Sequence, residues 1–448
     1  MNRHPLEALL RPTWPVQLED GNAVPEVEGR VACRTDGGPR RWLRSGDWQI
    51  YASSASRCDA RGDVIDTFVR DGGATLAAFQ DASTGEVTIP FSLADAYGSY
   101  VSERWREASA NRRLSERTLR VFYRVKSAVP RRVQLAARRR LIARQGIPDF
   151  PSWPVDVSVS QLVRFYACCT LRAAGRAEGE FAWFWPGDHR AAIILTHDVE
   201  GDDGVRHALE LADLEQEHGF RSSFNFGAWY ERLDPGVLRE LTARGFEIGM
   251  HGLTHDRQLF ASRAAFEERL GPLGELAGRL GSVGFRSPAT HRVFDWLGEL
   301  PVDYDCTMPN SDPYEPLPGG CCSVWPFFID EVVELPYTLP QDHTLLTLLA
   351  RRSPKLWLEA AAAIEREYGL IQCVSHPDTG YLGDADKRAV YAEFLSGIAA
   401  RPALWRALPR DVAAWWRSRA SAASGAAGLR RGIARLDGEP RAVLLPPA

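Results

Sequence analysis

Nine of the ten histidines lie between His189 and His376, so a reactive site is expected in that part of the chain. Two of them belong to the sequence Met250-His251-Gly252-Leu253-Thr254-His255, which follows a run typical of a buried strand. If the chain turns into a helix there, the two imidazoles come to lie on one face, one turn apart. Such a pair can hold one divalent ion, typically Zn²⁺. The same spacing is also compatible with one packing and one exposed histidine.

Two acids follow the apolar run 191–195. The sequence continues as Thr196-His197-Asp198-Val199-Glu200, so two carboxylates leave the end of a strand that we expect to be covered on both faces. Residues i and i+2 of an extended chain point to the same side, so both acids can face one site. Taken alone, the stretch is equally compatible with an ordinary acidic loop.

Polar residues also mark the ends of three later strand-like runs. They are Arg286 in Gly284-Phe285-Arg286-Ser287-Pro288, Asp305 in Asp303-Tyr304-Asp305-Cys306-Thr307 and His376 in Cys373-Val374-Ser375-His376-Pro377-Asp378. Each alone could serve a structural purpose. Because parallel strands present their carboxyl ends at one rim, we expect these residues to converge with Asp198, Glu200, His251 and His255.

The elements that would position these residues alternate between strands and helices. Strands are expected at residues 193–196, 222–226, 246–251, 283–286, 304–307, 332–337 and 370–376. Amphipathic helices fall between most of them, at 204–219, 235–244, 266–280 and 356–368, and two later helices, 387–399 and 411–419, would close the domain. This alternation predicts an α/β fold, either a parallel (β/α) barrel or a doubly wound sheet.

We expect the chain to divide into five segments. Residues 1–100 read as a smaller N-terminal domain of mixed α/β character, and residues 101–145 as a basic helical segment. A connector rich in proline and tryptophan covers 146–190, and the barrel covers 191–420. Residues 421–448 have low complexity and are expected to be partly disordered.

The composition limits the class of protein. With 448 residues, 45% of them hydrophobic and 25% charged, the chain is typical of a globular protein of two or three domains. It contains no uncharged apolar run of about 18 residues and no apolar core of a signal peptide near Met1. The eight scattered cysteines are expected to be reduced thiols, which favours a cytoplasmic protein.

The basic segment 101–145 is a candidate contact surface. It holds 14 arginines and lysines against three glutamates. It could bind an anionic membrane surface or a lipid-linked substrate, which would make the protein peripheral to the membrane. Alternatively, it packs against an acidic neighbouring domain. Nucleic acid is a weaker expectation because few aromatic residues are present to stack on bases.

In their order along the chain, these motifs resemble those of polysaccharide deacetylases with a NodB-homology domain. That family combines an acidic strand end, an H-x-x-x-H motif, an R-x-P motif, an aspartate motif and a late histidine motif, here spread over residues 190–380. The resemblance implies a distorted (β/α)7 barrel and metal-dependent hydrolysis of an N-acetyl or related amide. The first motif, His-Asp-Val-acid, is typical of a divergent branch.

The resemblance also implies roles for the site residues. Family members usually carry two adjacent aspartates, a base and then a metal ligand, whereas here Val199 separates the two acids. We expect Asp198 to be the base and Glu200 the third metal ligand, beside His251 and His255. In the alternative, Asp198 is the ligand and the base is Glu200 or His197. His251 is followed by Gly252, where the family prefers Ser or Thr.

The expected reaction needs two further groups. Arg286 would orient Asp198 through an ion pair, and His376 would protonate the leaving amine, with Asp305 or Asp378 holding its ring. The expected substrate is an N-acetylated sugar or a lipid-linked precursor of one. The alternatives are a hydrolase of non-sugar amides or cyclic imides, a catalytically silent carbohydrate-binding module, and a basic scaffold protein.

Overall fold

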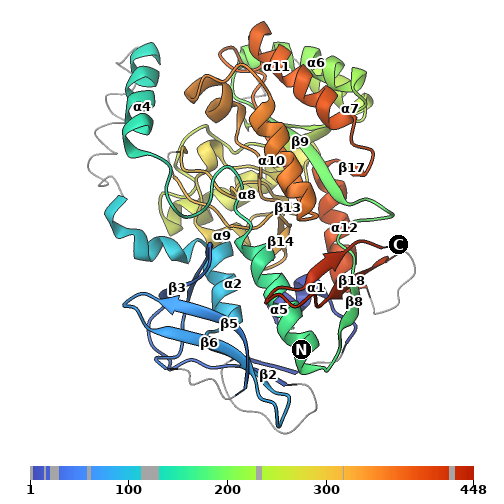
Figure 1. Cartoon of the computed structure of the whole chain (residues 1–448). Coiled ribbons are helices and arrows are strands. Elements are labelled where there is room, and N and C mark those ends of the chain that lie inside the picture. The colour runs from blue at the N-terminus through green and yellow to red at the C-terminus, as the bar shows by residue number, and fades with distance from the viewer. Residues whose placement is uncertain are drawn as a thin grey trace.

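The structure, a computed structural model, describes residues 4–14, 17–20, 30–57, 62–112, 131–228, 235–315, 317–422 and 429–447. Within these residues the strands form three sheets. A curved sheet wrapped by helices makes up the larger body, and a second sheet makes up the N-terminal body below it in Figure 1.

The larger sheet has the strand order β14-β15-β13-β12-β11-β10-β9-β16, and β17 also pairs with β9. Its parallel strands are β9 (Ala191–Val199), β10 (Ser223–Phe226), β11 (Glu247–Met250), β12 (Gly284–Phe285), β13 (Tyr304–Asp305), β15 (Val332–Glu334), β16 (Leu370–Ser375) and β17 (Leu404–Arg406). β14 (Phe327–Ile329) runs antiparallel to β15. The seven predicted strands correspond to β9, β10, β11, β12, β13, β15 and β16.

The sheet curls back on itself. The backbone N–H of Leu339, just after β15, donates to the carbonyl oxygen of Gln372 in β16 at 3.1 Å. This bond joins the two ends of the parallel series through irregular backbone. The predicted distorted (β/α)7 barrel is therefore confirmed, and the doubly wound alternative is excluded by the closure.

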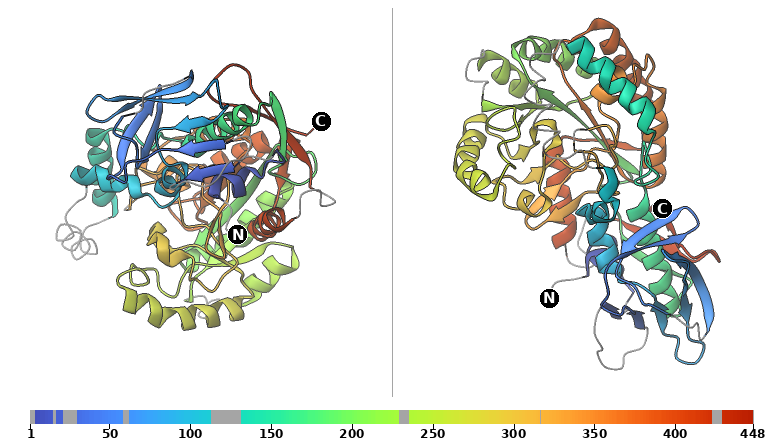
Figure 2. Two further views of the ribbon diagram at one scale, coloured as in Figure 1. Left: turned by 90° about the horizontal axis from the view of Figure 1, so that it is seen from below. Right: turned by 90° about the vertical axis from the view of Figure 1, so that its left-hand side faces the viewer.

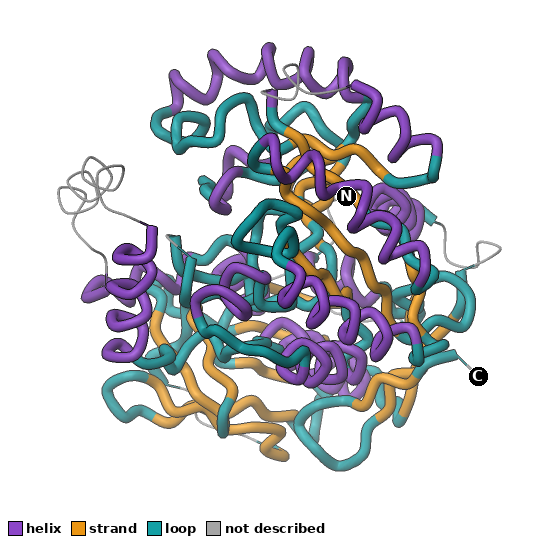
Figure 3. Tube along the Cα trace, turned by 90° about the horizontal axis from the view of Figure 1, so that it is seen from above, coloured by secondary structure: helices purple, strands orange, loops and turns teal. Residues whose placement is uncertain are grey.

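Helices cover the outside of the barrel, as Figure 2 (right) and Figure 3 show. They are α6 (Asp202–Glu217), α7 (Pro235–Ala243), α8 (Arg263–Leu280), α9 (Phe294–Leu297), the π-helix η4 (His343–Leu348), α10 (Lys355–Arg366), α11 (Ala385–Ala399) and α12 (Pro409–Ser421). The sequence explains their placement. In α10, for example, Trp357, Ala360, Ala361 and Ile364 are buried, and their spacing forms one helical face. Every residue of β9 is buried because helices and barrel interior cover its two faces.

The N-terminal body contains both strands and helices. Its sheet has the order β1 (Gln17–Asp20), β2 (Arg30–Cys33), β7 (Val87–Ile89), β6 (Thr75–Gln80), β5 (Asp63–Arg70), β3 (Arg41–Ser45) and β4 (Trp48–Ala52), with helices α1 (Pro5–Leu10) and α2 (Leu93–Val101). Helix α5 (Ser158–Ala173) belongs to its core, since Phe165 packs against the rings of Trp48, Phe68 and Phe91. The segment predicted as a connector therefore also builds this unit.

The C-terminal segment differs from the expectation of partial disorder. β18 (Arg431–Arg435) pairs with β19 (Val443–Leu445) and with β8 (Glu178–Ala182) in a small antiparallel sheet. Ala434 and Leu444 are buried in it. The burial of these apolar side chains holds a stretch whose composition alone is typical of disorder.

The basic segment contains the 3-10 helix η1 (Arg104–Arg112) and the helix α4 (Arg131–Gln145). The helical pattern predicted between residues 113 and 130 lies outside the described residues. α4 lies against η4 at one side of the barrel (Figure 1). Among the helices described here, none has the length and apolar character needed to cross a bilayer.

Candidate metal and catalytic site

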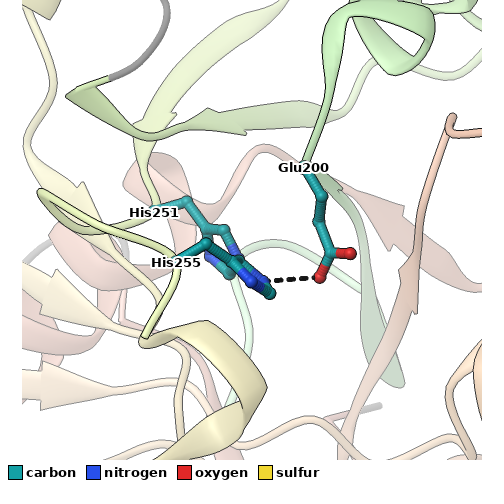
Figure 4. A group of neighbouring side chains, drawn as sticks. All are labelled: Glu200, His251 and His255. Atoms are coloured by element: carbon teal, nitrogen blue, oxygen red, sulfur yellow. Dashed lines mark hydrogen bonds and ion pairs between the residues drawn. The ribbon is translucent and has the colours of Figure 1, made fainter. Parts of the chain in front are cut away.

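Glu200, His251 and His255 come together at the carboxyl ends of β9 and β11. One ligand atom of each lies within 4.8 Å of the others, as a shared metal ion requires (Figure 4). Nε2 of His255 is 2.7 Å from Oε1 of Glu200, and the rings of the two histidines are 5.5 Å apart. The spacing that predicted a pair of histidine ligands therefore does bring both rings to one place.

The backbone between the two histidines is a loop and not the expected helix, since α8 begins only at Arg263. Gly252 turns the chain with a φ of +87°, a conformation that disfavours residues with a side chain. A Cβ at this position would also lie 3.2 Å from the Cδ of Pro288. This explains why glycine replaces the serine or threonine expected after His251.

The ring of His251 has the tautomer and the charge that a metal ligand needs. Nδ1 of His251 lies 3.0 Å from the carbonyl oxygen of Arg286, which can only accept, so Nδ1 carries the proton and Nε2 carries the lone pair. Burial lowers the pKa of His251 to about 4, so its ring is neutral, as a ligand must be. Two imidazoles and a carboxylate form a donor set that suits a borderline-soft divalent ion such as Zn²⁺.

Asp198 lies beside this cluster in the last part of β9 and is held by the neighbouring strand. Its Oδ1 accepts a hydrogen bond of 2.8 Å from the side-chain amide of Asn225. Gly249 makes room for that amide, because a Cβ there would lie 1.9 Å from Oδ1 of Asn225. Oδ1 of Asp198 is also 3.8 Å from Nδ1 of His251. The Asp198 side chain is thus fixed next to the candidate metal ligands.

Arg286 is completely buried and faces the same carboxylate. Its Nε lies 3.7 Å from Oδ1 of Asp198, and its Nη2 donates to Oγ1 of Thr196 at 2.9 Å. Burial alone would raise the pKa of Asp198, but the positive charges of Arg286 and His376 hold it below its ordinary value. Asp198 is therefore ionised at neutral pH.

His376 follows β16 and completes the rim. Its Nε2 is 3.8 Å from Oε1 of Glu200, and its Nδ1 is 2.7 Å from Oδ1 of Asp342. Burial opposes the charge of His376, yet the carboxylates of Asp342 and Glu200 outweigh burial and raise its pKa to about 10. The ring of Tyr381 packs against His376 with 4.7 Å between centroids. His376 is thus an oriented and protonated imidazolium.

The ring of His376 is held by Asp342, and neither Asp305 nor Asp378 forms that bond. Asp305 lies opposite Glu334 in the register of β13 and β15, and its Oδ1 accepts from Oγ1 of Thr307 at 2.6 Å. Burial raises the pKa of both Asp305 and Glu334, so this carboxyl pair retains a proton. Asp378 instead accepts the backbone N–H of Glu200 at 3.1 Å. It therefore fixes the backbone of a candidate ligand.

His197 lies on the other side of β9 from its neighbour Asp198. Its Nε2 is 2.7 Å from Oε1 of Glu215 in α6, and its Nδ1 is 2.8 Å from Oγ of Ser375. Oε1 of Glu215 also accepts from the hydroxyl of Tyr391. His197 thus joins the sheet to its helix layer, and its ring packs against Phe224 with 4.7 Å between centroids.

The R-x-P loop brings another histidine close to the H-x-x-x-H loop. Ala289 and Thr290 both have positive φ values, 50° and 52°, and the next residue, His291, is 6% exposed. Neither ring nitrogen of His291 has a hydrogen-bond partner among the described residues. Burial lowers the pKa of His291 to about 3, and the charges that act on it include that of His255. A neutral, buried imidazole therefore lies near His255.

Three site residues had no signal in the sequence motifs. Asn225, Asp342 and His291 lie in stretches whose residue types are unremarkable, and only the strand register and the loop paths bring them to the rim. Asn225 was predictable only as a member of a strand. Asp342 precedes the π-helix η4 as its N-cap, and the polar sequence Gln341-Asp342-His343 was the one usable indication for it.

No protein-family model matches this chain, and no curated protein sequence does. Solved structures do resemble it. A predicted polysaccharide deacetylase from Mycobacterium smegmatis is 19% identical over 53% of this chain and 94% of its own, with a TM-score of 0.43. The Puue allantoinase is 16% identical over 52% of this chain and 92% of its own, with a TM-score of 0.41. The peptidoglycan deacetylase PdaC from Bacillus subtilis is 13% identical over 52% and 95%, with a TM-score of 0.34. The family suggested by the motifs is thus represented among these structures.

Proposed function

We propose that this protein is a metal-dependent hydrolase that removes an acetyl group from the nitrogen of a sugar. The observation that carries the proposal is the grouping of Glu200, His251 and His255 within 4.8 Å of one another, next to an ionised Asp198 and a protonated His376. Three protein ligands leave coordination positions open, as catalytic sites require. A base and an acid on the two sides of such a site match the needs of amide hydrolysis.

Zn²⁺ is the proposed ion, and Glu200, His251 and His255 are its proposed ligands. Such an ion supplies Lewis acidity, which polarises an amide carbonyl and makes water a stronger acid. The Glu200 backbone is fixed by Asp378, and His251 is fixed by the carbonyl oxygen of Arg286. These outer contacts hold the donors in place before any ion binds.

Asp198 and His376 are the proposed proton carriers. Asp198 accepts a proton from the attacking water, and Arg286 and Asn225 keep its carboxylate ionised and oriented. His376 donates a proton to the leaving amine from Nε2, because its Nδ1–H is held by Asp342. The amide C–N bond breaks as water adds its oxygen to the acyl carbon, giving acetate and a free amine. Asp305 accepts no proton in this scheme. Its carboxyl group lies near Arg286, whose charge acts on it.

The proposed substrate is a single N-acetylated sugar or a sugar precursor in the cytoplasm, where the protein would work either free or at the membrane face. Support comes from the cation-rich helix α4 beside the barrel, which favours a substrate that carries an anionic group. Contact of this segment with an anionic membrane surface stays a prediction. Flotation with anionic vesicles at low salt would test it, and failure to float would contradict it.

Acetate release and metal content together test the proposed function. The purified full-length chain is incubated with N-acetylated sugars, and with a cyclic amide for comparison, before and after chelation and Zn²⁺ return. We expect acetate release that is lost on chelation and restored by the metal. His251→Ala should lose both metal and activity, whereas His218→Ala, which removes a histidine from α6's C-terminal end, should keep both. Opening of the cyclic amide without acetate release would replace the proposed substrate class.

A further inference from the structure

A cavity lies beside the catalytic rim. Its volume is about 700 Å³, and it is lined by parts of α4, of η4 and of the start of α11. Helix α4 contributes Leu135 and Arg139 to it, the chain after η4 contributes Arg351 and Arg352, and α11 contributes Lys387. None of these residues takes part in the reaction proposed above.

The cavity has an excess of positive charge. Lys387 pairs with Asp384 at 3.1 Å, and Arg352 forms a close ion pair with Asp386. No ion pair with an acid is found for Arg139 or Arg351 in the described part of the chain. Nη2 of Arg139 donates to the carbonyl oxygen of Thr347, which also lines the cavity, at 2.5 Å. Two guanidinium groups therefore remain for an anion, and guanidinium groups suit phosphate in particular.

The wall of this cavity is continuous with the catalytic rim. Thr379 and Gly380 line it and lie only three and four residues after His376, so no more than about 14 Å of extended chain separates them. The hydroxyl of Thr347 donates to the carbonyl oxygen of Gly380 at 3.2 Å. Tyr381 packs on His376 with 4.7 Å between ring centroids and on His343 with 5.7 Å. The rim and the cavity therefore share the segment from His376 to Gly380.

We propose that the cavity binds a phosphate or diphosphate group that is attached to the N-acetylated sugar. The substrate class is then a sugar linked to a phosphate and not a neutral glycan, an inference that rests on the proposed function. The conjugate can continue beyond the phosphate as a lipid or as a nucleoside. Leu135, Leu346 and Val390 line the same cavity and would contact an apolar continuation.

Direct binding tests the cavity without turnover. Inorganic diphosphate, farnesyl diphosphate and uridine diphosphate are titrated calorimetrically into the full-length chain. The titrations use a His251→Ala background, so that diphosphate does not bind at the candidate metal. We expect Arg139→Ala/Arg351→Ala to weaken diphosphate binding by about ten- to a hundredfold. Arg239→Ala is the matched control, because Arg239 is an exposed arginine of α7 that does not line the cavity.

The three probes distinguish the sources of the phosphate. Tighter binding of farnesyl diphosphate than of the other two indicates a lipid conjugate, and tighter binding of uridine diphosphate indicates a nucleotide conjugate. Absence of binding, or equal binding by the double variant and the control, would overturn the phosphate site. In the chain with His251 intact, the double variant should lose its preference for phosphorylated over neutral N-acetylated sugars while it still releases acetate from the neutral ones.

The two proposals fail in different ways. A chain that binds diphosphate through Arg139 and Arg351 but releases no acetate supports the phosphate site and contradicts the proposed function. A chain that releases acetate equally from neutral and phosphorylated sugars, and binds no diphosphate, contradicts the phosphate site alone.

Discussion

Asp342 holds His376 through both the ring and the backbone. Oδ1 of Asp342 accepts from Nδ1 of His376 at 2.7 Å, and Oδ2 accepts from the backbone N–H of the same residue at 2.9 Å. Oδ1 also accepts from the backbone N–H of His343 at the start of η4. One fully buried carboxylate therefore fixes the position, the tautomer and the charge of the proposed proton donor.

Asp342→Asn should slow the reaction without removing the metal. The carboxylate of Asp342 is the strongest influence that raises the pKa of His376, so its loss lowers that pKa. Because His376 must be protonated to act, the fall of activity at high pH should move to lower pH. We expect kcat to fall by about 10²- to 10⁴-fold. The pH profile of kcat and the metal content of wild type and variant provide the measurement.

The double variant Asp342→Asn/His376→Gln supplies the control. If Asp342 acts only through His376, the double variant should be no slower than His376→Gln alone. Additive losses in kcat, or an alkaline limb that stays in place in Asp342→Asn, would show that Asp342 does not tune His376.

Glu200 and Asp198 should differ sharply in their effect on metal binding. Oε1 of Glu200 faces His255, whereas Oδ1 of Asp198 is taken up by Asn225 and lies near Arg286. We therefore expect Glu200→Gln to weaken metal binding by about 100-fold or more. Asp198→Asn should keep the metal and lose about 10²- to 10⁴-fold in kcat. Metal titration of the apo-protein measures both, and loss of metal in Asp198→Asn alone would exchange the two roles.

The strands and most helices were predictable because their signals are local. The run from Ala191 to Leu195 is apolar without alternation, as a strand covered on both faces must be, and it became β9. The carboxyl end of each parallel strand then placed Asp198, His251, Arg286 and His376 at one rim. Helix α10 followed from the spacing of its apolar residues.

The contacts between distant residues were not predictable in the same way. His376 lies 34 residues after Asp342, and only the path of η4 and α10 brings the two together. Asp305 appeared from its position to be a partner of that histidine, yet the strand register places it opposite Glu334. The short strand β18 pairs with β8, which lies far away in the chain. The composition of the C-terminal segment therefore could not predict this strand.

Glu103→Gln should destabilise the protein strongly. Glu103, just after α2 in the N-terminal body, forms two bonds with Arg292 of the barrel, at 2.6 Å and 3.0 Å, and both side chains are buried. Removing one partner leaves a buried charge, which costs about 3–5 kcal/mol. We expect a large fall in the urea midpoint of Glu103→Gln, and a smaller fall when Arg292→Met is combined with Glu103→Met.

The exposed ion pair of Arg263 and Glu299 is the matched control. Glu299 is on the surface of the barrel and pairs with Arg263 at 2.6 Å, a distance equal to that of the buried pair. Solvent screens this pair, so Glu299→Gln should leave the urea midpoint almost unchanged. Equal shifts for the two glutamate variants would mean that burial does not strengthen the contact between the N-terminal body and the barrel.

Glu247 should make the stability of the protein depend on pH between about pH 4.5 and 7. Burial raises the pKa of this glutamate from 4.5 to about 7, although the hydroxyl of Tyr304 donates to its Oε1 at 2.7 Å. The folded state therefore holds a proton that the unfolded state releases. Its stabilising contribution is complete below pH 4.5 and is lost as the pH rises through about 7, which amounts to at most about 3 kcal/mol.

Glu247→Gln removes this titration. The free energy of unfolding of wild type and variant is measured in urea at several pH values. The difference between the two should change between about pH 4.5 and 7 and should be constant above about pH 7. Relative to wild type, the variant should gain stability as the pH rises. The same substitution at the exposed Glu331 is the control and should give no such trend. A pH-independent difference for Glu247→Gln would show that the buried carboxyl is ionised throughout.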